Sequence, residues 1–214
     1  KFDETIGNIA ADSSGNNINA TVSGAAWQSG GWIDGALDFD GNNDYVDTTI
    51  LGSSITNVTF SLWFQSDDAG SIGDNRVAQR FFTQVRSGSN TRLAVGINNN
   101  KLAAYWRDPS HNIGEGTTTL SGGRWYHAAL TYDGSDIRIY LDGTEENSFP
   151  ESNMSESSAG TIEIGWDPGA KGSRYFDGLL DDVRIYRQAL TATEIQTIYN
   201  QNEYCCSVQE QILP

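Results

Sequence analysis

The chain has 214 residues, and its 28 acidic and 13 basic side chains give a formal net charge of −15. This length suits one domain around a single core, and the charge repels phosphate backbones and anionic lipid, which disfavours nucleic acid as a partner. No apolar run reaches the length needed for membrane insertion, and the 23 glycines with many aromatic residues favour strands and turns over helices.

The first clear strand pattern lies at residues 59–64. Phe60, Leu62 and Phe64 alternate there with other side chains, which is the period of a half-buried strand. Two further strands are predicted at residues 93–97 and 102–106, each bounded by Gly, Asn, Asp or Pro.

An antiparallel hairpin follows. Alternating segments at residues 126–132 and 137–141 are joined by a turn that contains Asp133 and Gly134. Shorter strand patterns at residues 161–164 and 183–186 continue the series, and no segment between them has the composition of a linker. The sequence therefore predicts one domain.

The chain ends in a helix pattern. Thr191 and Glu194 have the spacing of a capping box, and Ile195, Ile198 and Tyr199 recur at helical spacing. We expect this helix to cover an edge or an end of the sheets, with a domain at residues 1–200 and a tail at residues 201–214.

The tail contains Cys205 and Cys206, the two cysteines of the chain, so disulfides cannot staple the body of the fold. A bond between adjacent cysteines would strain the peptide between them, and we therefore expect these two not to bond to each other. The chain begins at Lys1 without an apolar leader, so we expect any targeting segment to have been removed.

An eight-residue pattern, FDGxxDxV, occurs at residues 39–46 and again at residues 176–183. With one copy near each end it is no tandem array, and two unrelated turns would also explain it. The alternative is a pair of similar strand entries whose glycines adopt a positive φ.

Six segments taken in order make the chain resemble the laminin-G-like jelly roll of the concanavalin A-like lectin and glucanase superfamily. They are DSSGNN at 12–17, GGWIDGALDFDGNNDYVD at 30–47, VTFSLWF at 58–64, GGRWYHAALTYDGSDIRIYLDG at 122–143, IEIG at 162–165 and FDGLLDDVRIYRQALTATEIQTIYN at 176–200. The resemblance implies an all-β fold, a two-sheet antiparallel jelly-roll sandwich of concanavalin A-like type, here with one short C-terminal helix. It also implies neighbouring N- and C-terminal strands, often a calcium ion near a sheet edge, and a binding role, but a fold alone does not select a ligand.

Acidic and amide side chains gather at the two FDGxxD turns and at an earlier loop. Calcium takes six to eight oxygen ligands, which such residues supply. The same residue types are common in turns because their side chains bond their own backbone, so a metal is one of two explanations. The candidate calcium ligands are Asp12, Asp40, Asn43, Asp44, Asp181 and Asp182.

Two loops combine tryptophan with polar and charged residues, the mixture that sugar recognition needs. Either tryptophan could instead belong to the core, because large aromatic residues are common inside β-sandwiches. The segments DPSHNIGEG and DPGAKGSRY lengthen these loops with residues that no core requires. The candidate ligand-binding residues are Trp106, Arg107, Asp108 and His111 in one loop, and Trp166, Asp167, Arg174 and Tyr175 in the other.

Catalytic patterns are missing. Glycosidases need two carboxyl groups that flank the scissile bond, but the Glu, Asp, Glu alternation of related glucanases is absent, and only Glu163 with Asp167 comes near it. His127 lies in an alternating strand, where a structural role is more common than catalysis. Arg76, Arg80 and Arg86 form a basic group that is more typical of a solvated or ion-paired strand face than of a site for an acidic glycan.

These observations favour a non-catalytic, secreted or cell-surface module, stabilised by calcium, that binds a glycan or glycoconjugate for adhesion or polysaccharide targeting. The alternative is an adhesive or structural module that binds other proteins. We expect no insertion into a membrane and no nucleic-acid partner.

Overall fold

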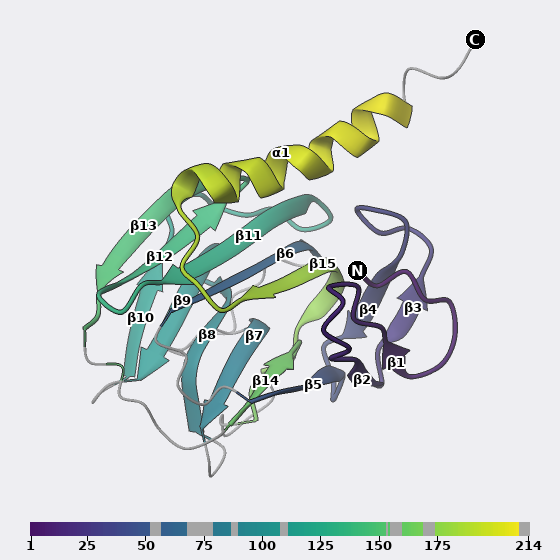
Figure 1. The fold of residues 1–214 in the computed structure, drawn as a ribbon, viewed down its shortest axis with the longest axis horizontal. Helices are drawn as coiled ribbons and strands as arrows, with labels where there is room; N and C mark the ends of the chain where they lie inside the picture. The colour runs from purple at the N-terminus through teal and green to yellow at the C-terminus, as the bar shows by residue number, and fades with distance from the viewer. Residues whose placement is uncertain are drawn as a thin grey trace.

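The computed structural model describes residues 1–51, 57–67, 79–86, 90–107, 111–152, 154, 160–168 and 174–209. These residues form two antiparallel sheets packed face to face, with a helix laid over the outer face of one of them (Figure 1). The predicted all-β sandwich with a C-terminal helix is confirmed.

The first sheet has eight strands. In spatial order they are β1 (Ile9–Ala10), β2 (Ala20–Ser23), β5 (Tyr45–Leu51), β14 (Thr161–Ile164), β7 (Gln79–Arg86), β8 (Asn90–Asn98), β9 (Lys101–Arg107) and β10 (His111–Glu115). The second sheet has seven strands: β13 (Thr144–Pro150), β12 (Asp136–Leu141), β11 (Trp125–Tyr132), β6 (Val58–Ser66), β15 (Asp177–Tyr186), β4 (Ala36–Asp40) and β3 (Ala26–Gln28). Every strand segment predicted from the sequence lies within one of these strands.

The two FDGxxDxV segments lie side by side. Strands β4 and β15 are antiparallel neighbours, with Asp40 opposite Asp177 and Phe39 opposite Gly178. The rings of Phe39 and Phe176 meet edge to face at 6.0 Å, and the Gly41 amide donates to the Phe176 carbonyl at 3.1 Å. The repeated pattern therefore marks a pair of strands near the two ends of the chain, as the family resemblance implies.

The core lies between the sheets and is rich in phenylalanine. A β-bulge in β7 places Phe81 and Phe82 both toward the core, where Phe81 contacts Phe176 and Phe82 stacks on Phe60 at 4.9 Å. An ordinary strand would turn one of two adjacent side chains outward. The bulge thus explains how two consecutive aromatic residues are both fully buried.

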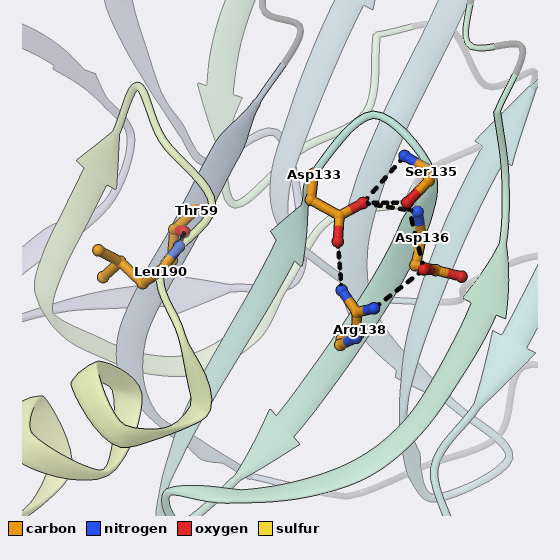
Figure 2. A network of polar contacts seen from close by, with 6 residues as sticks. All are labelled: Thr59, Asp133, Ser135, Asp136, Arg138 and Leu190. Carbon is orange, nitrogen blue, oxygen red and sulfur yellow. Dashed lines mark hydrogen bonds and ion pairs between the residues drawn. The ribbon is translucent and has the colours of Figure 1, made fainter.

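The hairpin of β11 and β12 turns at Asp133, as predicted (Figure 2). The Asp133 carboxylate accepts backbone N–H groups of Ser135 and Asp136 at 2.9 and 2.8 Å. Arg138 bridges Asp133 and Asp136 at 2.6 and 2.9 Å. The turn is fixed by side chains that bond the nearby backbone, which is the chemistry expected of aspartate in a turn.

Helix α1 (Ala192–Gln209) begins at the predicted capping box. The Thr191 hydroxyl accepts the Glu194 amide at 3.3 Å, and the Glu194 carboxylate accepts the Thr191 amide at 2.8 Å. Just before the helix, the Leu190 amide donates to the Thr59 hydroxyl of β6 at 2.9 Å (Figure 2). The chain is thereby fixed to the sheet as it enters the helix.

The position of α1 differs from the expected edge or end. Ile195 and Ile198 pack with Ala129 and Tyr140 on the outer face of the seven-stranded sheet, and the helix lies across that face (Figure 1). Ala129 and Tyr140 are buried there because the helix covers them. The helix continues past residue 200 to Gln209, so most of the expected tail is helical, whereas the side chains of Cys205 and Cys206 lie outside the described residues.

Candidate functional site

Three half-buried aromatic rings from separate segments form a patch, which we call the aromatic shelf. It consists of Tyr45, Trp166 and Tyr175. The rings of Trp166 and Tyr175 are parallel within 4° at a centroid distance of 5.7 Å, and Tyr45 lies 5.0 Å from Trp166. Val46 points into the core, so its neighbour Tyr45 faces away from the core and places the shelf on the outer side of the eight-stranded sheet.

Gly165 turns the chain so that Trp166 leaves the sheet. Strand β14 ends at Ile164, and Gly165 then adopts a φ of 79°. A Cβ atom on this residue would lie 2.4 Å from the Phe39 ring, so a side chain fits neither the space nor the conformation. Backbone bonds from Gly165 to Phe81 at 3.0 Å and from Phe176 to Gly165 at 2.9 Å hold both ends of the loop.

Asp167 points away from the shelf into a buried ion network. Its exposed fraction is 1%, and Arg80 donates to it through Nε at 3.1 Å and through Nη2 at 3.0 Å. Thr91 also donates to this carboxylate, and Arg174 Nη1 lies 3.7 Å from it. The prediction that Asp167 and Arg174 contact ligand at the rim is wrong, because both side chains are buried and ion-paired.

Arg80 is the cation that pairs most closely with Asp167 in this network. It is fully buried, and its burial lowers the pKa to about 10, so the guanidinium remains charged at neutral pH. The expectation of an ion-paired strand face is confirmed for Arg80. The side chain of Arg86 and all of Arg76 lie outside the described residues.

Arg80 also connects the two predicted loops. Its guanidinium lies 5.2 Å from the centre of the Tyr105 ring, and Tyr105 lies 5.8 Å from the ring of His111. His111 is exposed and pairs across the β9–β10 hairpin with Arg107, which is half-buried. Of the first loop, Arg107 and His111 therefore remain at the surface, and Asp108 lies outside the described residues.

Trp106 belongs to the core, which contradicts its predicted place at a binding rim. It lies opposite Leu93 in the sheet, its exposed fraction is 7%, and its ring packs 5.4 Å from Phe149. Its Nε1 donates to Glu151 at 2.8 Å, which satisfies the one polar group of the indole. The inward phase of β9 sets this orientation.

His127 is a buried strand residue, as expected. Its Nε2 lies 2.9 Å from the Ser61 hydroxyl, and the ring lies beside Trp63 and Tyr199, which stack on each other, beneath the helix. Burial lowers its pKa to about 4, so the ring is neutral at physiological pH. The side chain is 1% exposed, which leaves no route for a substrate to reach it.

The predicted calcium ligands are held mainly by hydrogen bonds within their turns. In the described ranges, no group of three or more His, Cys, Asp or Glu residues could hold a metal ion. The backbone N–H groups bonded to these side chains follow the turn-chemistry explanation: Ser14 and Ile18 to Asp12, Asn42 to Asp40, Asp40 to Asp44, and Ile33 and Asp182 to Asp181. Asp182 pairs with Arg184 at 2.7 Å, and Asn43 adopts a positive φ of 51°.

Four of the five predicted carboxylates thus accept backbone N–H groups, and the fifth, that of Asp182, is paired with Arg184. Burial raises the pKa of Asp181 to about 6 and also raises that of Asp44. Calcium itself stays a prediction. A comparison of melting temperatures with and without a chelator would check it.

Sequence reasoning missed Tyr45 and Tyr105. Tyr45 adjoins an inward-facing Val46, so strand alternation alone identifies it as an outward-facing aromatic residue. Tyr105 also faces outward, but its exposed fraction is 4%. Strand alternation predicts the outward direction and does not reveal that the side chain is covered. Its partner Arg80 lies far away in sequence, and only the pairing of β7, β8 and β9 brings the two together.

The sandwich and the outward aromatic shelf define a binding-module architecture. The family model of the concanavalin A-like lectin/glucanases superfamily matches residues 39–196. The chain therefore belongs to this superfamily, which confirms the resemblance drawn from the six sequence segments.

Two of the matching proteins are binding or adhesion proteins by their names. Adhesion G-protein coupled receptor V1 of Danio rerio is 25% identical over 164 residues, which span 72% of this chain and 2% of the receptor. The binding domain of Paraclostridial Mosquitocidal Protein 1 has a TM-score of 0.68 at 18% identity, and 89% of this chain covers 49% of that one. This chain thus spans a small part of the receptor and about half of the toxin domain.

A third match covers almost the whole of its own length. Domain 4 of an extracellular family-43 arabinanase from Geobacillus stearothermophilus, solved in complex with arabinotriose, has a TM-score of 0.60 at 20% identity. The match covers 87% of this chain and 91% of that domain. At these identities the structural likeness establishes a shared fold.

No helix in the described part of this chain is both long and apolar enough to cross a membrane.

Proposed function

We propose that this domain is a non-catalytic extracellular module that binds a glycan through the aromatic shelf. The observation that carries the proposal is the parallel stack of Trp166 on Tyr175, half-exposed on the outer side of a sheet, with Tyr45 beside it. Aromatic faces bind the apolar side of sugar rings, and rings held by a rigid scaffold lose little entropy on binding.

The buried ion network supports this role by fixing the loop. Asp167 follows Trp166 directly in the chain. Its side-chain bonds to Arg80 and Thr91 therefore fix the backbone next to the tryptophan. A contact surface that is ordered before binding avoids part of the entropic cost of association. In this proposal Asp167 is a positioning residue, and it does not touch the sugar.

The carboxyl groups favour binding over hydrolysis. The carboxylate of Asp167 is committed to Arg80, and that of Glu163 accepts the Thr161 hydroxyl at 2.7 Å. Burial raises the pKa of Glu163, as a general acid requires, but hydrolysis also needs a second carboxylate across the bond. The ion-paired Asp167 does not supply it.

A glycan array that includes arabinotriose tests the proposal, with the intact chain as the probe. We expect a defined set of bound glycans, and Trp166→Ala should weaken binding to them by at least about tenfold because ring stacking is lost. Tyr175→Ala should have the same direction of effect.

Trp125→Ala is the matched control, since Trp125 is also half-buried but lies on the seven-stranded sheet. This variant should retain the affinity of the unaltered domain. Equal losses in both tryptophan variants would reject the shelf as the site. An array without any bound glycan would favour the alternative, an adhesive module that binds protein, which the likeness to an adhesion receptor supports.

A further inference from the structure

A recess lies on the opposite side of strands β5 and β14 from the aromatic shelf. It is a cleft of about 970 Å³, bordered by the N-terminal segment and by the last residues of β15. Its apolar lining includes Ile50, Val183 and Ile185, which are half-buried and pack against the main core. The cleft therefore opens between the inner faces of the two sheets.

One wall of this cleft is a strand edge. Strand β15 pairs with β6 as far as Tyr186, whereas β4 accompanies its other side only through residues 177–180. A register shift after Asp181 and the positive φ of 47° at Asp182 interrupt the strand at this point. In the described part of the chain no strand continues β4 alongside Val183 and Ile185, so a length of sheet edge faces the cleft.

The rim of the cleft has local positive charge on a strongly acidic protein. Lys1 and Arg187 line it, and Arg187 is exposed. Arg184 is neutralised by its ion pair with Asp182 at 2.7 Å. Asp12 also lies at the rim, with its two carboxylate oxygens directed to the amides of Ser14 and Ile18.

We infer that this cleft binds an extended peptide segment of a partner protein, which adds as a strand to the edge of β15 at Val183 and Ile185. Alternate apolar side chains of the peptide would occupy the floor near Ile50, and an acidic residue would face Lys1 and Arg187. Strand addition draws affinity from backbone hydrogen bonds and specificity from every second side chain.

The strand edge favours a peptide over an acyl chain. An acyl chain would fill the apolar floor, but it would remove water from the edge without offering hydrogen bonds, which costs free energy for each polar group left unsatisfied. A peptide strand supplies donors and acceptors at the spacing of the edge. This site is separate from the aromatic shelf, so it does not depend on the glycan proposal.

The experiment uses a pooled library of capped octapeptides that alternate varied apolar residues with threonine and carry a terminal glutamate. Binding to the intact domain is measured by fluorescence anisotropy, and amide chemical shifts locate the contact. We expect selected members to bind and to shift the amides of Val183 and Ile185. N-methylation of alternate peptide bonds in the best binder should weaken it by about tenfold, since edge hydrogen bonds are lost without a change in side chains.

Protein variants test the charge and the location. Arg187→Glu should weaken binding several-fold, whereas Lys101→Glu, the same charge reversal at the first residue of β9, should leave it unchanged. Trp166→Ala should also leave peptide binding intact.

Three results would overturn the inference. They are no binding by any library member, equal affinity of the N-methylated peptide, and shifts that map away from β15. Competition by dodecanoate, without any effect of N-methylation, would assign the cleft to an acyl chain instead.

Discussion

The two tryptophan loops look alike in sequence and differ in structure. Trp106 and Trp166 each come just before an Asp-Pro pair, yet Trp106 lies in the core and Trp166 lies half-exposed on the shelf. The difference follows from where each residue stands relative to its strand. Trp106 occupies an inward position inside β9, whereas Trp166 comes after β14 has ended and after Gly165 has turned the chain.

This contrast teaches that loop composition does not assign a residue to a binding surface. Strand phase and the end of the strand decide it, because side chains alternate between the core and the outside only while the strand continues. The comparison yields predictions that separate a core tryptophan from a surface tryptophan.

Trp106→Ala should have the largest effect, a loss of about 3 to 5 kcal/mol in the free energy of unfolding. The substitution removes a buried ring from its contact with Phe149 and leaves the Glu151 carboxylate without its indole donor. Urea unfolding followed by fluorescence would measure the change. A loss below about 1 kcal/mol would place Trp106 at the surface and remove the contrast between the two loops.

Asp167→Asn should cost about 3 kcal/mol, because breaking a buried ion pair leaves the Arg80 charge uncompensated. Its neighbour Trp166 should then lose order, so glycan affinity should fall together with stability. Arg138→Gln, in the partly exposed ion pairs of the β11–β12 turn, is the control and should cost less than about 1 kcal/mol. Equal costs would mean that the Asp167 network is exposed to solvent.

His127 extends the comparison to pH, because it faces outward from β11 and is buried by helix α1, whereas Trp106 is buried by the inward phase of its strand. Its pKa of about 4 lies below the ordinary 6.5, so the unfolded chain binds more protons between these values and stability falls as pH decreases from 6.5 to 4. For complete burial this amounts to about 2 to 3 kcal/mol at the acid end. Asp181, with a pKa raised to about 6 from 3.8, acts in the opposite direction as pH rises through 6.

The variant His127→Gln separates these two contributions. The difference in unfolding free energy between the unaltered chain and this variant should increase from pH 4 to pH 6.5, when both are measured by urea titration. Parallel curves would show that His127 titrates normally and is not buried in solution.

Trp166→Ala should have the smallest effect on folding, less than about 1 kcal/mol, since a half-exposed ring contributes little core burial. The same urea titration would measure it beside Trp106→Ala. A cost near that of Trp106→Ala would show that the shelf is part of the core, and the site would then have to be sought elsewhere.

Strand positions were predictable from local sequence, whereas the candidate site was predictable only in part. The alternation at residues 59–64, the Asp133 turn and the Thr191–Glu194 capping box each correspond to an element of the structure. Trp166 and Tyr175 also meet as expected. Trp106, Asp167 and Arg174 were misplaced, because their burial depends on contacts with strands far away in the chain.

The sequence by itself determined the fold class, the hairpin, the start of the helix and the acidic charge, since periodicity, turn chemistry and composition act over a few residues. Tertiary structure decided which face α1 covers, which tryptophan is exposed, and that Arg80 joins Asp167 to Tyr105. It also decided which backbone N–H groups the predicted calcium ligands accept, as in the bond from Ile33 to Asp181. These outcomes depend on strand order and register, which bring together residues that local sequence leaves unrelated.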